Sequence, residues 1–220
     1  MASFVRHGHE YQLYTYDPMD LPAGVRQRDA REILPPARVF LYSQGPEKGS
    51  VAGFSNLFRY RLLLTRGGWW VDADVVCLSR DVPEGDLFFG WEAPDVVGSA
   101  ILKLPAGHAL ARDLYAESER AGTGVVWAQT GPTLVTRLIH EMGLSPQCWP
   151  QEASYPVPWR DAMALIRPES RDEVRAKTEG APFLHIWNEI FRRNCPSGLV
   201  DPPEGSYLAE LFEQYRAAPC

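Results

Sequence analysis

The sequence has few cysteines and no long apolar run. The four cysteines, Cys77, Cys148, Cys195 and Cys220, show no CxxC spacing, so a structural disulfide framework is not indicated and a reducing compartment fits. No stretch of eighteen apolar residues occurs, and the first residues lack the apolar core of a signal peptide. We therefore expect a cytoplasmic protein, with peripheral contact to a membrane as an open alternative.

An excess of positive charge is also absent, because the formal net charge is −6. This balance does not lead us to expect a nucleic-acid partner. Repeats and low-complexity runs are missing as well. With 45% hydrophobic and 23% charged residues over 220 positions, the composition predicts a globular protein with a sizeable core, folded as a single domain over residues 1–220.

Short apolar strands alternate with amphipathic helices along the chain, which predicts an α/β fold with a mixed sheet. Helices are expected near Ala2–His7, Ala30–Leu34, Phe54–Arg66, His108–Ala121, Pro132–Met142, Glu169–Lys177 and Tyr207–Arg216. Strands are expected at Tyr11–Tyr16, Arg38–Tyr42, Trp69–Leu78, Leu87–Trp91 and Ser99–Lys103.

Two aspartates interrupt the apolar run WWVDADVVCL at 69–78. In an extended backbone the side chains of Asp72 and Asp74 point the same way, roughly 7 Å apart along the strand. Two carboxylates that face one space repel each other unless a positive group lies between them, and a divalent cation is a suitable partner. The alternative is a strand end at which the aspartates only cap a turn.

The helix expected at 54–66 carries polar residues at its start and leads directly into this strand. Its apolar residues recur at the i, i+3, i+4 spacing, Ser55 is the expected N-cap, and a Gly-Gly pair ends it. Ser55, Asn56 and Arg59 then share one edge of the first turn, where free N–H groups and a cation favour anionic or hydroxyl-rich ligands. Both polar clusters could therefore face the same end of a sheet.

The run FSNLFRYRLLLTRGGWWVDADVVCL at 54–78 resembles the core motif of the DXD-containing sugar transferases. That group includes α-1,4-galactosyl- and N-acetylglucosaminyltransferases and, more distantly, the clostridial glucosylating toxins. Four further segments resemble the family in its own order: GSAILKLPAGHAL at 98–110, QTGPTLVTRL at 129–138, YPVPW at 155–159 and HIWN at 185–188. A lone DxD is weak evidence, but five motifs in order are specific.

The resemblance implies a GT-A-like, Rossmann-type fold with a mixed, mostly parallel sheet. It also implies a metal-dependent, retaining glycosyltransferase of polysaccharide biosynthesis. The donor would be a nucleotide sugar, expected to be a UDP-sugar, and the acceptor a glycan, a lipid-linked glycan or another molecule. A protein with net charge −6 does not attract a diphosphate through its overall field, and a bound cation would supply that attraction.

Site residues follow from the matching positions. Asp74 would coordinate Mn²⁺ or Mg²⁺, and Asp72 would reach the ribose, the sugar or a metal-bound water. His185 is a candidate further ligand to the metal or to phosphate, against the alternative of a packed core histidine. The resemblance assigns catalysis to Asp72, Asp74 and Arg59, and donor binding to Ser55, Asn56, Arg59, Trp70, Asp72, Ser99, Gly131, Trp187 and Asn188.

The chain departs from the family pattern in three places. Asn56 stands where the family usually has aspartate, and Ser99 stands where relatives often have asparagine, so sugar preference and rate are open. Relatives also begin with a strand ahead of the first helix, whereas this chain opens inside that helix. We therefore expect a sheet that lacks its first strand, through either a misplaced start codon or a truncated paralogue.

Three interpretations stay open at this point. The first is the metal-dependent glycosyltransferase. The second is a non-catalytic or impaired sugar-nucleotide-binding paralogue on the same fold, which Asn56, Ser99 and the absent strand favour. The third is a phosphohydrolase of the haloacid-dehalogenase type, which also uses DxD after a strand. That chemistry needs a long apolar strand before the aspartate nucleophile, and here only three residues separate Asp72 from the Gly-Gly pair.

Overall fold

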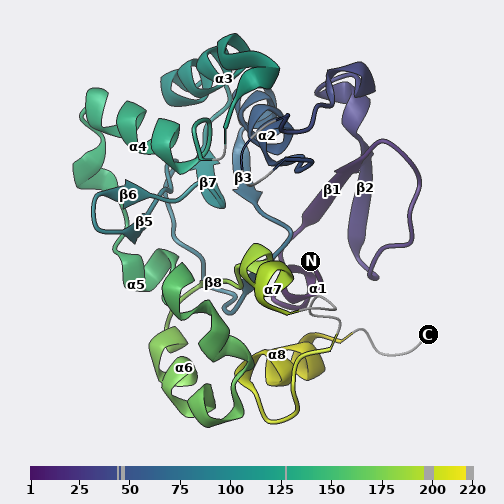
Figure 1. Cartoon of the computed structure of the whole chain (residues 1–220), viewed down its shortest axis with the longest axis vertical. Coiled ribbons are helices and arrows are strands. Elements are labelled where there is room, and N and C mark those ends of the chain that lie inside the picture. Colours follow the sequence, from purple (N-terminus) through teal and green to yellow (C-terminus); the bar gives the residue numbers. More distant parts are fainter. Residues whose placement is uncertain (44, 46–47, 127, 196–200, 217–220) are drawn as a thin grey trace.

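Helices and short strands alternate along the computed structural model, which describes residues 1–43, 45, 48–126, 128–195 and 201–216 (Figure 1). The strands pair two by two. β1 (Tyr11–Thr15) and β2 (Val25–Asp29) are parallel. The other three pairs are antiparallel: β3 (Gly68–Val71) with β7 (Ile101–Leu104), β4 (Val75–Cys77) with β8 (Phe183–His185), and β5 (Trp91–Ala93) with β6 (Val96–Val97).

This arrangement confirms the α/β class and corrects the expected sheet. Within the described residues, one of the four strand pairs is parallel, so the prediction of a mostly parallel sheet is wrong. The physical reason is that β7 and β8 run along β3 and β4 in the opposite direction. The chain reaches β7 through β4, β5 and β6, and it reaches β8 only after the helices α3 to α6. The sequence pattern of short apolar strands does not encode that direction.

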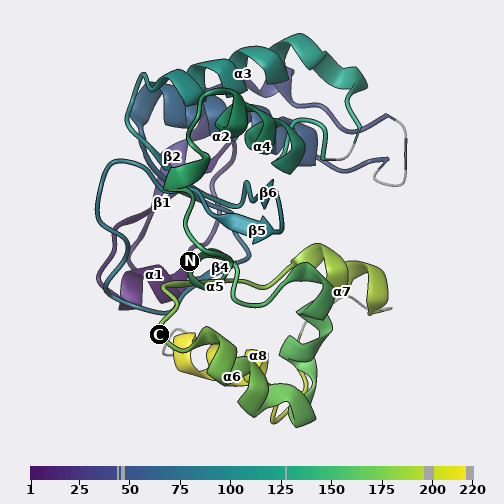
Figure 2. The same ribbon diagram turned by 90° about the vertical axis from the view of Figure 1, so that its left-hand side faces the viewer.

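The helices form two groups on either side of the strands, as Figure 2 shows. One group consists of α2 (Ala52–Arg66), α3 (Ala109–Ala121) and α4 (Pro132–Glu141), and the other of α6 (Arg171–Thr178) and α8 (Tyr207–Tyr215). Shorter helices are α1 (Ala2–Arg6), α5 (Gln151–Ser154) and α7 (Asn188–Asn194). The 3₁₀ turns are η1 (Ala30–Glu32), η2 (Pro36–Arg38), η3 (Gly122–Gly124), η4 (Ser145–Gln147), η5 (Trp159–Ile166) and η6 (Pro168–Ser170).

Buried apolar clusters fix the segments that carry the polar motifs. One cluster joins Tyr60 and Leu63 of α2 to Leu102 of β7 and Val135 of α4. A second cluster joins α1, β1, β4, β7 and β8 through residues that include Phe4, Tyr11, Val75, Ile101 and Phe183. Because this second cluster packs β4 against β8, it holds the aspartate run next to the HIWN segment, 110 residues further along the chain.

Several element boundaries differ from the predictions. No strand forms at 38–42, where two prolines initiate η2 instead. The strand β2, VRQRD, was not predicted, because an exposed strand with charged residues lacks the apolar pattern of a core strand. Helix α2 begins at Ala52 rather than at 54, so Ser55 lies inside the helix and Val51 is the N-cap. The remaining long helices lie where they were expected.

The run at 69–78 is not one strand. β3 ends at Val71, β4 begins at Val75, and the Val75 amide donates to the Asp72 carbonyl at 3.0 Å. The aspartates therefore lie on a tight turn between two short strands. Within the described residues, no helix has the length and apolar composition needed to cross a bilayer.

Gly67 ends α2 with φ 65° and ψ −164°, a conformation essentially restricted to glycine. A Cβ atom at this position would lie 2.4 Å from the backbone nitrogen of Ala106. Gly122 ends α3 with the closely similar φ 65° and ψ −150°, but a Cβ there would meet nothing within 4 Å. A side chain at Gly122 would therefore cause backbone strain alone, whereas a side chain at Gly67 would cause the same strain and a steric overlap with Ala106.

We predict that Gly122→Ala lowers the free energy of unfolding by about 1–3 kcal/mol, the cost of backbone strain alone. Gly67→Ala should cost about 1–3 kcal/mol more, because the overlap with Ala106 forces the backbone to shift. Urea unfolding followed by circular dichroism measures both values. Equal losses for the two variants would contradict the close approach of α2 and the segment after β7.

Candidate functional site

The turn between β3 and β4 brings Asp72 and Asp74 into one cluster with His185. β8 pairs with β4, and His185 lies directly opposite Val75. Val75 follows Asp74 in the sequence, so this pairing brings His185 next to Asp74. Ligand atoms of Asp72, Asp74 and His185, one from each side chain, all lie within 4.8 Å of one another. Oxygen and imidazole donors at this spacing are a chemically suitable set for Mn²⁺ or Mg²⁺.

Asp74 is held by three contacts with the segment 185–188. His185 Nε2 lies 3.2 Å from Asp74 Oδ1, and the Asn188 amide donates to Asp74 Oδ2 at 3.0 Å. The Ile186 amide donates to the Asp74 carbonyl, also at 3.0 Å. The Asp74 side chain is three-quarters buried, so these three contacts fix the position of the carboxylate.

Burial and charge act in opposite directions on this pair. Burial alone would raise the pKa of Asp74, but the charge of His185 and the hydrogen bonds from His185 and the Asn188 amide outweigh it and lower the pKa to about 2. Burial alone would lower the pKa of His185, and the negative charge of Asp74 outweighs it, so that the pKa is raised. Both shifts favour an ion pair of carboxylate and imidazolium when no metal is bound.

Asp72 has a different partner. Arg59 of α2 donates from Nη2 to Asp72 Oδ1 at 2.6 Å, and the Trp70 indole donates to the same oxygen at 2.6 Å. The Arg59 guanidinium also lies 5.1 Å from the centre of the Trp70 ring and is only 3% exposed. Asp72 keeps 28% of its side chain exposed. Arg59 and Trp70 thus fix one carboxylate oxygen of a group that stays partly exposed.

A buried network of hydrogen bonds through Asn56 and Thr130 holds Arg59 in place. Asn56 Oδ1 accepts from Arg59 Nη1 at 3.0 Å, and Asn56 Nδ2 donates to Thr130 Oγ1 at 3.3 Å. A Cβ atom on Gly131 would lie 3.3 Å from Asn56 Nδ2 and 3.7 Å from Ser99 Oγ. The predicted residues Asn56, Ser99 and Gly131 therefore lie together, and the glycine leaves room for the other two.

The structure adds two residues that the sequence motifs did not single out for the site. Glu92 on β5 lies near Asp72 and His185: burial raises its pKa, the charge of His185 lowers it, and the negative charge of Asp72 raises it further. Tyr155, in the segment YPVPW, is fully buried with its ring 6.0 Å from the His185 ring. The signal for Glu92 was a charged residue at the end of an apolar run, which is weak without the fold.

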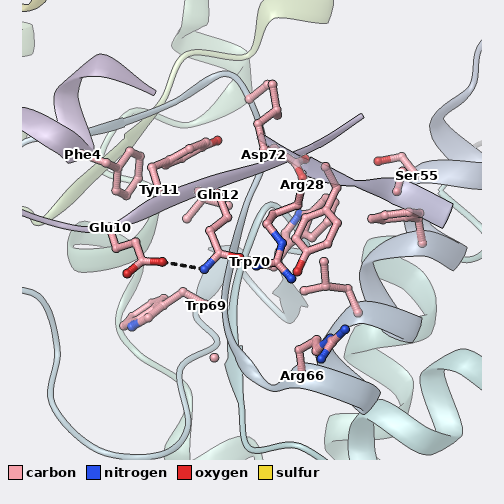
Figure 3. A pocket seen from close by; sticks show the side chains of 18 of the residues that line it. Phe4, Glu10, Tyr11, Gln12, Arg28, Ser55, Arg66, Trp69, Trp70 and Asp72 are labelled. Carbon is pink, nitrogen blue, oxygen red and sulfur yellow. Dashed lines mark hydrogen bonds between the residues drawn. The ribbon is translucent and has the colours of Figure 1, made fainter. Parts of the chain in front are cut away.

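Trp187 and Asn188 lie at the cluster, whereas Ser55 lies on a neighbouring cavity. The Trp187 ring centre is 4.0 Å from that of His185, and the Asn188 side chain is exposed. A cavity of about 850 Å³ opens beside Asp72, with Ser55 and Trp70 on its wall (Figure 3). The structure therefore gathers every predicted site residue around Asp72 and Asp74 or onto this adjoining cavity.

The cavity follows the edges of two strands. Consecutive residues 9–14, which include most of β1, line one side, and consecutive residues 66–73, which include β3, line the other. Side chains of a strand alternate between its two faces, so consecutive lining residues mean that the cavity runs along strand edges. β1 is paired only with β2, and β3 only with β7, among the described strands. The facing edges of β1 and β3 are thus unpaired with each other.

Comparison with known proteins adds three findings. Residues 103–215, about half of the chain, match the family described as alpha 1,4-glycosyltransferase conserved region. Lactosylceramide 4-alpha-galactosyltransferase from Rattus norvegicus is 25% identical over 172 residues, covering 73% of this chain and 46% of that protein. The proteins of the same name from Pongo pygmaeus and Homo sapiens are 25% and 24% identical over 73% of this chain, covering 77% and 47% of their own lengths. No solved structure matches significantly.

The chain thus spans about half the length of the rat and human relatives it matches. The matched family region contains Gly131, His185, Trp187 and Asn188, whereas Asp72 and Asp74 precede it. The family match therefore bears directly on the HIWN side of the cluster, and the metal role of the two aspartates rests on the geometry described above.

The Asp74–His185 pair predicts a pH dependence of stability. Because the pKa of Asp74 is lowered in the folded protein, its carboxylate contributes to the free energy of unfolding in full above pH 3.8. This contribution is lost as the pH falls toward 2. Because the pKa of His185 is raised in the folded protein, its imidazolium contributes to the free energy of unfolding in full below pH 6.5. This contribution is lost as the pH rises through the raised pKa. The Asp74–His185 pair therefore stabilises the fold most between pH 3.8 and pH 6.5.

We predict that His185→Gln costs about 1–3 kcal/mol at pH 6, since it leaves a largely buried carboxylate without its partner. The variant should also lose less stability than the wild-type protein between pH 6 and 9. Urea unfolding in EDTA measures both effects. His140→Gln is the control, because His140 is exposed and bonded to Ser145 Oγ. A wild-type pH slope in His185→Gln would contradict the ion pair.

Proposed function

The chain belongs to the α-1,4-glycosyltransferase family, and on that premise we propose that it is a metal-dependent glycosyltransferase. It would move a sugar from a nucleotide-sugar donor, expected to be a UDP-sugar, to a glycan or lipid-linked acceptor with retention of the anomeric configuration. The observation that carries the proposal is the convergence of Asp72, Asp74 and His185 to within 4.8 Å. A cytoplasmic location stays a prediction from the sequence.

The donor set fits a hard divalent cation. Asp74 and Asp72 offer carboxylate oxygens, and His185 offers a ring nitrogen. The low pKa of Asp74 keeps its carboxylate ionised at any pH at which the enzyme would work. His185 Nδ1 is buried and has no hydrogen-bond partner among the described residues, whereas Nε2 faces Asp74 and is the nitrogen placed to bind a cation. When bound, Mn²⁺ or Mg²⁺ would supply Lewis-acid stabilisation of a leaving diphosphate.

The protein's own groups divide the remaining work. Arg59 neutralises Asp72 and, with Trp70, fixes its orientation, so the turn holds two carboxylates side by side without a metal. Asp72 and Ser55 line the same cavity, where the carboxylate can accept hydrogen bonds from the hydroxyls of a donor sugar and the Ser55 hydroxyl can donate or accept them. The exposed Asn188 side chain lies at the Asp74 end of the same cluster.

The paralogue without catalysis keeps one observation in its favour. Arg59 is engaged with Asp72 and Asn56 and is 97% buried, so it does not reach a diphosphate in this arrangement unless those contacts open. Metal-dependent hydrolysis or transfer of a nucleotide sugar separates the two functions. The family match gives no support to the phosphohydrolase interpretation.

Asp74→Asn tests the metal role directly. The amide keeps the shape of the side chain but loses the charge, so we expect donor turnover with Mn²⁺ to fall roughly 100-fold or more. This is a larger fall than the roughly 10- to 100-fold loss seen when a residue that only hydrogen-bonds to a metal ligand is replaced. The measurement is release of nucleoside diphosphate from a panel of UDP-sugars. Asp81→Asn, an exposed aspartate outside the cluster, should behave as wild type. Full turnover by Asp74→Asn, with its fold verified by circular dichroism, would sink the metal assignment.

For the fold, we propose a GT-A-like architecture in which the cavity between β1 and β3 accepts one further strand. A strand occupies roughly 3.3 Å along the chain, 4.8 Å across the sheet and 10 Å through it, or about 160 Å³ per residue. Five residues, the length of β1, would then fill about 800 Å³, so the cavity of about 850 Å³ has room for them. Such a strand would satisfy both unpaired edges and join the two small sheets.

A version of the protein with a short strand-forming segment linked ahead of Met1 tests this proposal. We expect a higher soluble yield and a midpoint of thermal unfolding higher by about 5 °C or more, since a buried strand adds several kcal/mol. The matched control carries the same number of Gly-Ser residues at that end. Identical yield, unfolding and nucleotide-sugar hydrolysis for all three forms would refute the inserted strand.

A further inference from the structure

The segment 185–188 wraps around Asp74 with an unusual backbone. β8 ends at His185 and α7 begins at Asn188, so two residues, Ile186 and Trp187, turn the chain from strand to helix. Trp187 has φ 57° and ψ 47°, the left-handed conformation. An extended residue at 187 would carry the chain past Asp74 in the direction of β8. The left-handed turn instead aims the Asn188 amide at the Asp74 carboxylate.

A bulky aromatic residue rarely adopts this conformation, which costs roughly 1–2 kcal/mol for an L-residue. Among the described non-glycine residues, positive φ values occur at Asp95, Ala128 and Trp187. Aspartate tolerates the left-handed region comparatively well, because its short side chain bonds locally, whereas tryptophan does not. The strain at Trp187 therefore needs compensation from its surroundings, and strained residues of this kind gather at functional sites.

The indole supplies that compensation. Its Nε1–H donates to the Val157 carbonyl at 2.8 Å, which ties Trp187 to the loop after α5. Its ring centre lies 4.0 Å from that of His185 and 5.8 Å from that of Tyr155. The side of the ring that faces His185 is therefore occupied by protein. These contacts suit a residue that holds its neighbours in place.

We propose that Trp187 is a positioning residue: its left-handed backbone and anchored indole fix the His185 ring and the Asn188 amide against Asp74. The cation site is then formed before any cation binds. This inference rests on the proposed function in its metal step only. The geometry of the clamp itself, three contacts from residues 185, 186 and 188 onto Asp74, exists in the protein without metal.

A pair of substitutions isolates the backbone. Trp187→Gly and Trp187→Ala both remove the indole, but only glycine adopts the left-handed conformation without cost. In the alanine variant the segment should relax away from Asp74, and the Asn188 amide should exchange its hydrogen about 5- to 30-fold faster than in the glycine variant. Amide exchange is read by NMR on the metal-free protein. Trp187→Phe keeps a ring beside His185 without the N–H donor and tests the anchor to Val157.

Binding of Mn²⁺ alone, followed by electron paramagnetic resonance, gives the second measurement. A relaxed segment must be re-formed when the cation binds, so the dissociation constant of Trp187→Ala should exceed that of Trp187→Gly by the same factor. Asp95→Gly and Asp95→Ala are matched controls, because Asp95 has a similar positive φ at an exposed turn. Both controls should bind Mn²⁺ and exchange the Asn188 amide as the wild-type protein does.

The outcomes separate the two proposals. Equal exchange rates of the Asn188 amide in Trp187→Gly and Trp187→Ala overturn the positioning role, whatever the metal result. Faster exchange in Trp187→Ala supports it. If the wild-type protein binds no Mn²⁺ while the exchange difference is present, the metal step of the proposed function fails and the clamp on Asp74 stands.

Discussion

Repulsion between two carboxylates on one short turn is the constraint on which the site depends. The protein answers it with one cation for each carboxylate, Arg59 for Asp72 and His185 for Asp74. The two partners come from different parts of the fold, the first from α2 and the second from β8. Packing of the helix layer and of the β4–β8 pair therefore sets the charge balance of the cluster, and loss of either would leave a carboxylate unpaired in a partly buried place.

The two partners differ in what they allow. Arginine stays charged at every relevant pH and is buried beneath Asp72, so it acts as a permanent counter-charge. Histidine can lose its proton, and a metal ion brought to the cluster favours that loss, since imidazole coordinates in its neutral form. The Asp74 side of the turn is therefore the side that can exchange a proton for a cation, while the Asp72 side keeps its orientation.

Much of this site was predictable because its motifs are local and chemically unusual. Paired aspartates in an apolar run, and a histidine three residues before Asn188 in HIWN, carry their signal within a few residues of sequence. The turn geometry was not predictable, because WWVDADVVCL has the composition of one strand and the break at Asp72 depends on two separate partners, β7 and β8. Glu92 escaped notice for the same reason: only the hairpin of β5 and β6 brings it near the cluster.

Asn56 shows how a departure from the family pattern can be compatible with the site. An aspartate at this position would place a second carboxylate against Arg59, which would then divide its charge between position 56 and Asp72. Asparagine keeps the acceptor oxygen for Arg59 Nη1 and adds an N–H donor to Thr130. The guanidinium charge is thereby left for Asp72 alone. In a chain where Arg59 is buried beneath the aspartate turn, a neutral residue at 56 strengthens the ion pair that keeps the two site carboxylates together.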